Sequence, residues 1–425
     1  MSDKTLRFCM VTTFYPPYNF GGDGIFVHRL ANELARRGHR VDVVHCRDAY
    51  HLMAGGEPAG AYDDHPNVTV HGLKSGFGPL SPLAAQQTGR TLFKSTALRR
   101  IFSQRFDVVH FHNISLFGPK ILEYGDGVKL YTMHEYWLVC PMHTLYKFNR
   151  APCTKPDCFA CTLVYKRPPQ WWRYSGLLEA AVKQVDAFIA PSRFIADKHH
   201  EMGFAAPIVH LPYFVPDAVD DGLRPERATA EVTEKPYFLF VGRLEKLKGA
   251  QSLIPVFRKY PRARLLIAGT GNDERKLRRL AEGSDNIQFL GRLSDGALQP
   301  LYRHAVALIV PSLWFENLPL VIMEAFRQKT PVIARNLGAM REIIQESGGG
   351  FIYDDEKTLV DALARLTSDR AYRDTLGRWG HQTYAAEWGA DAHLNTYFEL
   401  IRNITVRRRS STIDPLSECA KSSNY

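Results

Sequence analysis

The sequence predicts an α/β protein made of two domains, each built on a parallel sheet. At 425 residues the chain is too long for one ordinary core and suits two domains of about 200 residues each. Short apolar runs alternate with helical patterns, as is typical of parallel sheets covered by helices. This alternation stops in a segment rich in Pro and acidic residues, 212–234, so we place the junction between the domains there.

The first domain, 1–215, is predicted from its alternating segments. The expected strands are 6–12, 40–45, 68–73, 107–111, 128–134 and 187–190, and a helix is expected over 25–37. After a linker, 216–235, the same alternation resumes in a second domain, 236–381. Its expected strands are 237–241, 264–268, 287–290, 306–310 and 331–334.

Composition narrows the class of protein. A hydrophobic content of 45% with 23% charged residues is typical of a soluble globular protein, and no run approaches the roughly 18 apolar residues that span a bilayer. The first residues lack the features of a secretory signal, so we expect a cytoplasmic protein. The net charge of +10 favours anionic partners such as nucleotides or an anionic membrane. Nucleic acid is not expected, because no zinc-finger spacing or ribonucleoprotein motif is present.

Two glutamates eight positions apart, Glu316 and Glu324, stand in surroundings that are otherwise almost wholly apolar. The strand before them ends at Pro311, and 318–328 reads as a helix with Pro319 in its first turn. Because this helix is apolar nearly all the way round, we expect it to be buried, and an ionised Glu324 then needs a partner. Hydroxyl groups of a ligand would supply one, and an arginine elsewhere in the chain is the alternative.

This segment resembles the E-x7-E element of the retaining family-4 glycosyltransferases. The resemblance implies the GT-B fold, which has two Rossmann-like, doubly wound parallel-sheet domains that face each other across a cleft. The resemblance implies transfer of a sugar from a nucleoside diphosphate donor, UDP- or GDP-linked, to an acceptor hydroxyl. The acceptor would be a glycan or lipid-linked and would belong to cell-surface polysaccharide biosynthesis. It also implies a closing helix, 382–407, that returns to the first domain, before a tail, 410–425, that we expect to be disordered. A non-catalytic nucleotide-sugar-binding protein, and an epimerase or phosphorylase of the same fold, remain alternatives.

Two cations, Arg243 and Lys248, follow a predicted strand and stand where a helix opens, a place that favours phosphate. The segment resembles the family's G-R-x4-K-G element, which implies that both side chains hold the diphosphate and stabilise the leaving group. No metal or other cofactor would then be required for catalysis. The resemblance further implies that Glu324 binds the ribose, and that Glu316 and the backbone of Asn317, Leu318 and Pro319 bind sugar hydroxyls.

Other strand ends in the second domain are further candidates for donor binding. Gly269 and Gly271 either let the backbone approach a ligand or serve a tight turn. Arg292 and Leu293 lie in a segment that resembles the one whose backbone meets the nucleobase.

The first domain contributes two candidate elements. Gly21 and Gly22 lie in a long loop before a helix, and eight residues separate the strand from these glycines, which argues against a dinucleotide fingerprint. The loop resembles the family's glycine-containing first loop, which implies that it closes over the donor phosphates. His134 lies in a segment that resembles the family's H-D-Y-W, with Glu135 in place of Asp. The likeness implies that His134 contacts the transferred sugar and does not act as a general base.

Four of the seven cysteines cluster at Cys140, Cys153, Cys158 and Cys161. This cluster predicts either a structural zinc site or reduced thiols in an inserted acceptor loop. The segment 90–105 is basic with interspersed apolar residues, and Trp171 and Trp172 follow Lys166-Arg167. Either segment could rest on an anionic membrane, and either could equally pack on the core.

Overall fold

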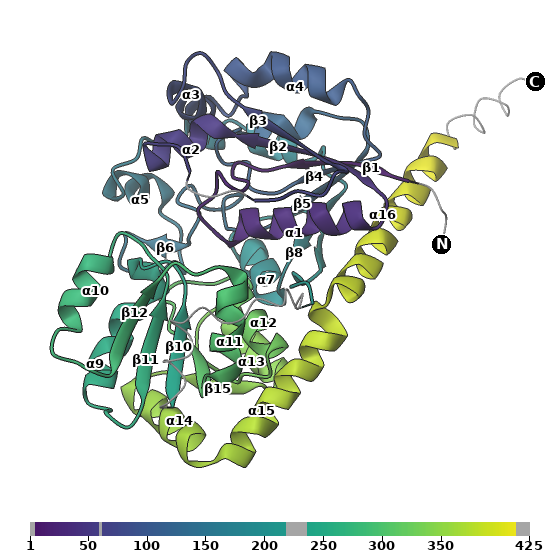
Figure 1. Ribbon diagram of the computed structural model, residues 1–425. Coiled ribbons are helices and arrows are strands. Elements are labelled where there is room, and N and C mark those ends of the chain that lie inside the picture. The colour runs from purple at the N-terminus through teal and green to yellow at the C-terminus, as the bar shows by residue number, and fades with distance from the viewer. Residues whose placement is uncertain (1–4, 59–61, 218–235, 414–425) are drawn as a thin grey trace, which may run out of the picture.

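The computed structural model describes residues 5–58, 62–217 and 236–413, and side chains up to residue 410. The chain forms two α/β lobes (Figure 1). The first holds a seven-stranded sheet in the order β3-β2-β1-β4-β5-β8-β9, and the second a six-stranded sheet in the order β12-β11-β10-β13-β14-β15. Every pairing within both sheets is parallel. The predicted pair of Rossmann-like parallel-sheet domains is therefore confirmed.

The strands of the first sheet are β1 (Arg7–Val11), β2 (Arg40–Cys46), β3 (Val68–Leu73), β4 (Val108–Phe111), β5 (Val128–Thr132), β8 (Ala187–Ala190) and β9 (Ile208–His210). Those of the second are β10 (Tyr237–Val241), β11 (Arg264–Ala268), β12 (Ile287–Gly291), β13 (Ala307–Val310), β14 (Val332–Arg335) and β15 (Gly350–Tyr353). Sequence analysis missed β9 and β15. Both are short and lie at a sheet edge, and a less buried edge strand carries a weaker apolar signal.

Helices lie between the strands. The first lobe contains α1 (Gly22–Arg36), α2 (Arg47–Ala54), α3 (Leu80–Thr88), α4 (Ser95–Phe102), α5 (Cys158–Val164), α6 (Leu177–Val182) and α7 (Arg193–Glu201). The second contains α9 (Leu253–Arg258), α10 (Glu274–Leu280), α11 (Asp295–His304), α12 (Leu320–Arg327), α13 (Ala339–Ser347), α14 (Glu356–Ser368) and α15 (Arg370–Thr383). A small hairpin, β6 (Tyr146–Lys147) with β7 (Ala151–Pro152), stands apart from both sheets.

The C-terminal helix α16 (Ala390–Ile413) runs from the second lobe along the side of the first (Figure 1). The hydroxyl of Tyr397 lies 2.9 Å from His110 Nδ1, and the guanidinium of Arg408 pairs with Asp186 at 2.7 Å. The boundaries differ from those expected. Residues 382–388 belong to the end of α15 and to a π-helical turn, Tyr384–Trp388. Residues 410–413 are helical, whereas 414–425 lie outside the described residues, as does all of the expected linker except 216–217.

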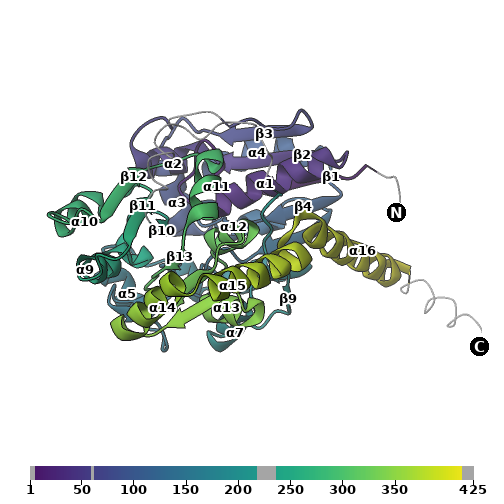
Figure 2. The same ribbon diagram turned by 60° about the horizontal axis from the view of Figure 1, so that its bottom comes forward.

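The two lobes share buried apolar contacts. One cluster of buried side chains joins Phe26 and Tyr213 of the first lobe to Ile322 of the second and to Trp388 of the crossing segment. Figure 2 shows α11 and α12 of the second lobe beside α1 of the first. Among the helices of the described residues, none is long and apolar enough to cross a membrane.

Candidate functional site

The candidate site residues gather where parallel strands end, which is where open α/β sheets place their ligands. His134 follows β5, and Lys248 and Glu316 lie in the loops after β10 and β13. The two lobes touch at these edges. Ser192 Oγ, after β8, donates to the carbonyl oxygen of Asn317 at 2.7 Å, and the Asn317 side chain donates to the carbonyl oxygen of His134. The sequence-predicted residues are thus brought to one interlobe region.

Glu316 is a buried carboxylate with three donors. Its Oε1 accepts hydrogen bonds from Lys248 Nζ at 2.7 Å, from Ser312 Oγ at 2.7 Å and from Trp314 Nε1 at 2.8 Å. Burial raises the pKa of this carboxyl group, but the charge of Lys248 and the hydrogen bonds outweigh burial and hold the pKa below its ordinary value. Its Oε2 accepts no hydrogen bond from the described residues. Glu316 is therefore ionised at neutral pH, with one oxygen available to a ligand.

A glycine brings Lys248 to this carboxylate. Gly249 has a φ of +80°, and a Cβ there would lie 2.0 Å from the carbonyl oxygen of Pro311. Any other residue would push the loop after β10 away from the loop after β13. The expected helix start is wrong at this point, because Lys246–Lys248 forms a single 3-10 turn and α9 begins only at Leu253. An anion bound in this loop would therefore be attracted less by backbone amides at a helix start than by the side chains of Arg243 and Lys248.

Arg243 lies in the same loop but pairs differently. Its Nη1 donates to Glu245 Oε1 at 2.9 Å, and its side chain is 48% exposed. The guanidinium is thus free to swing toward an anion, since an exposed ion pair of this kind holds it only weakly.

Glu324 corrects the sequence argument. The helix α12 is not buried all round, because Leu320, Val321, Glu324 and Arg327 share a half-buried face. Arg29 Nη2, from α1 of the first lobe, donates to Glu324 Oε1 at 3.0 Å, and the hydroxyl of Tyr302 donates to Oε2 at 3.1 Å. Of the two partners that the sequence left open for this carboxylate, a ligand or an arginine, the structure supplies the arginine. Arg29 also pairs with Asp295 at 3.1 Å, so one buried arginine ties both lobes together.

The two glycines after β11 have a clear packing role. Gly269 has a φ of +140°, and a Cβ there would lie 1.9 Å from the carbonyl oxygen of Gly242. A Cβ on Gly271 would lie 2.5 Å from the carbonyl oxygen of Leu244. Both residues let the loop that carries Arg243 pack directly on the loop after β11. This contact between the two loops is a third role, beside the ligand approach and the tight turn that the sequence left open.

The loop after β12 faces the first lobe. Arg292 is exposed, and its Nη2 donates to the hydroxyl of Tyr62 at 3.3 Å. Leu293 packs at the margin of the shared apolar cluster. Leu318 and Pro319 are buried before α12, with Pro319 immediately ahead of its first residue.

The glycine loop of the first lobe lies against the second. Helix α1 begins at Gly22, earlier than the expected residue 25, so Gly21 and Gly22 stand at its N-terminus. A Cβ on Gly22 would lie 3.4 Å from Leu320 Cδ1, so the loop reaches the start of α12. Asp23, which sequence analysis did not single out, accepts a hydrogen bond from Asn113 Nδ2 at 3.1 Å.

His134 has protein partners at both ring nitrogens. Its Nε2 lies 2.8 Å from His112 Nδ1, and its Nδ1 lies 2.6 Å from the hydroxyl of Tyr213. Burial lowers the pKa of His134 to about 4, so the ring is neutral at neutral pH. Sequence analysis missed His112 and Tyr213. The His-Phe-His-Asn run that ends β4 was a usable signal, because two polar rings at a strand end are unusual in a buried strand.

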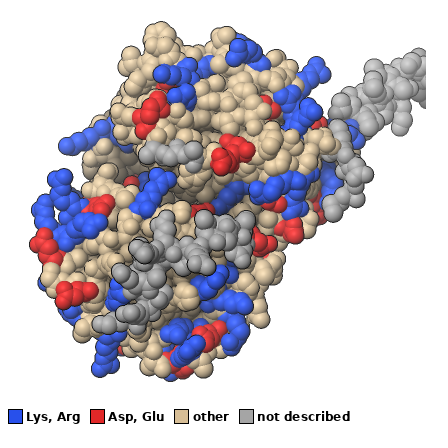
Figure 3. All heavy atoms as spheres, viewed as in Figure 1, with Lys and Arg blue, Asp and Glu red and all other residues tan. Residues whose placement is uncertain are grey.

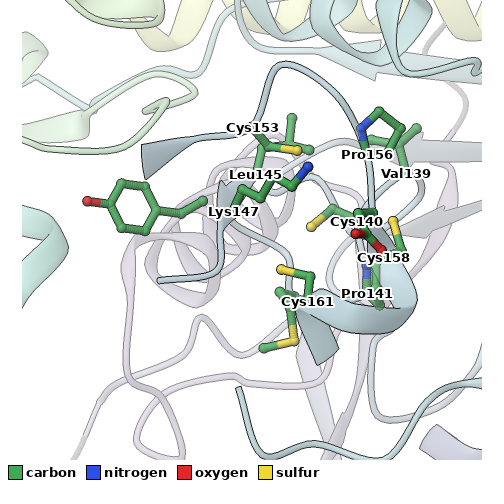
Figure 4. A pocket seen from close by; sticks show the side chains of 12 residues that line it. Val139, Cys140, Pro141, Leu145, Lys147, Cys153, Pro156, Cys158 and Cys161 are labelled. Carbon is green, nitrogen blue, oxygen red and sulfur yellow. The ribbon is translucent and has the colours of Figure 1, made fainter. Parts of the chain in front are cut away.

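Four sulfurs line a cavity of the first lobe (Figure 4). They belong to Cys140, Cys153, Cys158 and Cys161. In the described residues, no three His, Cys, Asp or Glu side chains are arranged so that they could hold a metal ion as they stand.

Comparisons with known proteins place these features in a family. Residues 20–219 match the model "Glycosyltransferase Family 4", and residues 225–383 match "Glycosyl transferases group 1". A D-inositol 3-phosphate glycosyltransferase of Arthrobacter sp. (strain FB24) is 26% identical over 390 residues, which is 84% of either chain.

Solved structures share the fold. The sucrose-phosphate synthase of Thermosynechococcus elongatus has a TM-score of 0.72 at 20% identity, over 95% of this chain and 100% of that one. Anabaena Alr3699/HepE in complex with UDP-glucose has a TM-score of 0.63 at 14% identity, over 93% of this chain and 99% of that one.

Proposed function

We propose that this chain, which belongs to the glycosyltransferases of family 4 and group 1, transfers a sugar from a nucleoside diphosphate to an acceptor hydroxyl with retention of anomeric configuration. The observation that carries the proposal is the buried pair of Lys248 and Glu316 at the meeting edges of the two sheets. It sets a cation for phosphate beside a carboxylate for hydroxyl groups, which are the two chemistries that a nucleotide sugar presents.

In the proposed donor complex, Arg243 and Lys248 bind the diphosphate. Lys248 keeps its contact with Glu316, and Glu316 Oε2 accepts hydrogen bonds from sugar hydroxyls. The backbone from Asn317 to Pro319 adds further contacts to the sugar. A solved structure of the same fold holds UDP-glucose, which supports a UDP-sugar as the donor. A GDP-sugar fits the same proposed contacts.

The ribose is proposed to bind Glu324, which requires an exchange of partners. Arg29 already holds one oxygen of this carboxylate, so ribose hydroxyls must share Glu324 with the guanidinium or displace it. Because Arg29 belongs to the first lobe, donor binding at Glu324 is coupled to how the lobes are held together.

For the transfer step, the two cations neutralise the charge that develops on the β-phosphate, so the chemistry draws on no metal ion in this proposal. The leaving phosphate then accepts the proton of the attacking hydroxyl on the same face of the sugar, which keeps the configuration. His134 is proposed as a positioning residue for the sugar. Its ring is neutral, has a low pKa and is hydrogen-bonded at both nitrogens, so it is unsuited to act as a general base. Its carbonyl oxygen accepts a hydrogen bond from the side chain of Asn317.

A thermal-shift panel with UDP, GDP, ADP and dTDP tests the donor. A ligand that binds only the folded state raises the melting temperature, and we expect UDP or GDP to do so far more than ADP. NMR of the product formed with the matching nucleotide sugar then reports the anomeric configuration. Tight donor binding without transfer to any acceptor would instead favour a binding protein, and release of free sugar phosphate would favour a phosphorylase.

We also propose that the acceptor is a glycan or lipid-linked and that the first lobe rests on the cytoplasmic face of an anionic membrane. Residues 65–106 and 158–178 contain no Asp or Glu. Large apolar side chains are exposed on these segments, namely Phe77, Leu80, Leu83, Leu92, Phe93, Phe159, Leu163, Val164, Trp171 and Tyr174. Trp172 Nε1 donates to the carbonyl oxygen of Gln86 at 2.7 Å, which joins the two segments into one surface.

This acid-free surface combines apolar side chains with Arg90, Lys166 and Arg167, as expected for the membrane interface. Elsewhere, Lys and Arg are spread over both lobes on the face that Figure 3 shows. Sedimentation with vesicles tests the proposal. Binding should require anionic lipid and weaken in Trp171→Ser, whereas Trp379→Ser, at an exposed position of the second lobe, should bind as the unchanged chain does. Equal binding to neutral vesicles would contradict it.

A further inference from the structure

The residues 140–161, which we call the cysteine insert, form a weakly supported part of the first lobe. Their regular structure consists of two-residue strands, β6 and β7, and the first turn of a seven-residue helix, α5. Of the seven non-glycine residues with positive φ in the described chain, four lie here, at His143, Leu145, Phe148 and Asn149. Residues with a Cβ avoid this conformation. Small units with so little hydrogen-bonded structure usually depend on an added cross-link.

The cavity inside the insert has the size and lining of an ion site. Its volume is about 20 Å³, and besides the four cysteines it is lined by Val139, Pro141, Met142, Leu145, Tyr146, Lys147, Pro156 and Asp157. This volume holds about one water molecule or ion, and a buried water there would need two to four polar partners. The sulfurs are weak hydrogen-bonding groups and the amine of Lys147 donates to the carbonyl oxygen of Lys155, so the lining suits water poorly. It suits a thiophilic cation.

Backbone amides already approach two of the sulfurs. Phe148 N donates to Cys161 Sγ at 3.4 Å, and the amides of Met142 and Leu145 approach the sulfur of Cys140. Cys158 and Cys161 stand three residues apart in α5, so one face of the helix carries both sulfurs. Figure 4 shows sulfurs from separate parts of the insert around the same cavity.

We propose that Cys140, Cys153, Cys158 and Cys161 bind one structural zinc ion. Four thiol S–H bonds break, four Zn–S bonds form, and four protons pass to solvent, with no change of oxidation state. Zn²⁺ prefers four thiolates in a closed tetrahedral site with Zn–S distances of about 2.3 Å. Since the described side chains do not yet meet at one point, the ion draws the sulfurs inward by rotation about their Cα–Cβ bonds.

The zinc site would act at the interlobe region. Lys246 Nζ donates to the carbonyl oxygen of Asn149 at 2.8 Å and lies 5.8 Å from the ring centroid of Tyr146. Lys246 stands two residues before Lys248, so a zinc-ordered insert supports the loop of the proposed phosphate clamp. This consequence rests on the proposed function, whereas the metal itself does not.

Elemental analysis of the full chain, purified without a metal-affinity step, tests the site. We expect about one zinc ion per chain. A mercurial reagent, which forms Hg–S bonds with the thiolates in place of the Zn–S bonds, should release the zinc, and Cys161→Ser should lose most of it. Cys46→Ala changes a buried free cysteine of β2 outside the insert and should keep full zinc. A zinc-free chain overturns the proposal, and so does stoichiometric iron or a pair of disulfides in the insert.

Cobalt substitution keeps the test valid if Cys161→Ser fails to fold. The unchanged chain, stripped of metal and loaded with Co²⁺, should show the intense sulfur-to-cobalt absorption of a tetrathiolate site. Absence of this band overturns the proposal. A measurement of nucleotide binding separates the two proposals. If the chain holds zinc but binds no nucleotide, the zinc site stands and the proposed glycosyl transfer is refuted.

Discussion

The pair of Lys248 and Glu316 allows stability and catalysis to be separated. In Lys248→Met the carboxylate of Glu316 loses the cation that lowers its pKa, and only the hydrogen bonds from Ser312 and Trp314 still oppose the effect of burial, so the pKa of Glu316 should rise. In the double variant Lys248→Met with Glu316→Gln, the buried charge is gone from both sides. If Lys248 binds the diphosphate, removing the unpaired carboxylate should restore the free energy of unfolding but should not restore turnover.

The structure sets the expected sizes. Breaking a buried pair by removing one partner costs about 3 to 5 kcal/mol, and the 25% exposure of the Lys248 side chain points to about 3 kcal/mol. The double variant should regain most of this loss. Turnover should fall about 10²- to 10³-fold in both variants, the usual effect of losing one charge contact at the transition state.

Urea unfolding and donor turnover, measured on the same preparations, check the prediction. Lys259→Met is the matched control, because Lys259 pairs with Glu356 at 3.0 Å on the same lobe with both side chains exposed. It should change stability by less than about 1 kcal/mol and leave turnover unaltered. If the double variant regains normal turnover, Lys248 only neutralises Glu316 and the clamp assignment is refuted.

Three further predictions follow from local geometry. Gly249→Ala should lower both the melting temperature and the donor affinity, because its Cβ meets Pro311. Gly283 has a similar φ of +75° and no atom within 4 Å of an added Cβ, so Gly283→Ala should lower stability alone. Equal donor affinities of the two variants would contradict this. Glu324→Gln should weaken UDP binding in calorimetry by about 1 to 2 kcal/mol, and Asp295→Asn, at an exposed partner of the same arginine, should leave it unchanged. Burial lowers the pKa of His45, His134, His199 and His393 to about 4. In the unfolded chain these histidines take up protons near pH 6.5, so their contribution to the free energy of unfolding is complete above that pH and is lost as the pH falls toward 4. At pH 5 the loss is on the order of 2 kcal/mol per histidine. A melting temperature that is constant from pH 7 to pH 5 would refute this.

The central strands could be predicted from the sequence because their apolar runs are continuous. The run Tyr-Phe-Leu-Phe-Val of β10 is buried almost throughout, and such a run has few alternatives to a parallel strand covered on both faces. Glu316 was singled out by its apolar surroundings and by the E-x7-E resemblance, and the argument that a buried carboxylate needs donors was made only for Glu324. The structure shows that Glu316 is itself buried and has three donors. Its partner Lys248 was also singled out, although no local pattern indicates that Gly249 brings the two loops together.

Partners from the other lobe were beyond the sequence. Arg29 lies on the face of α1 that meets α12, almost 300 residues later in the chain, and no periodicity within either helix discloses the contact. The same holds for His112 beside His134, which depends on β4 and β5 being neighbours in the sheet. Sequence patterns report how a segment is buried, whereas the identity of the burying group is a property of the fold.

Both glutamates of the candidate site are satisfied by cations in this structure, but the two cations come from different places. Lys248 belongs to the same lobe as Glu316, so that pair moves as one body when the lobes separate. Arg29 belongs to the opposite lobe from Glu324, so that pair breaks when they separate and leaves a carboxylate facing the opening. If the lobes separate to admit a donor, that donor would meet Glu316 beside Lys248 and Glu324 without Arg29. Arg29 could then return to Glu324 only if the ribose leaves room for it, which would couple donor binding to closure.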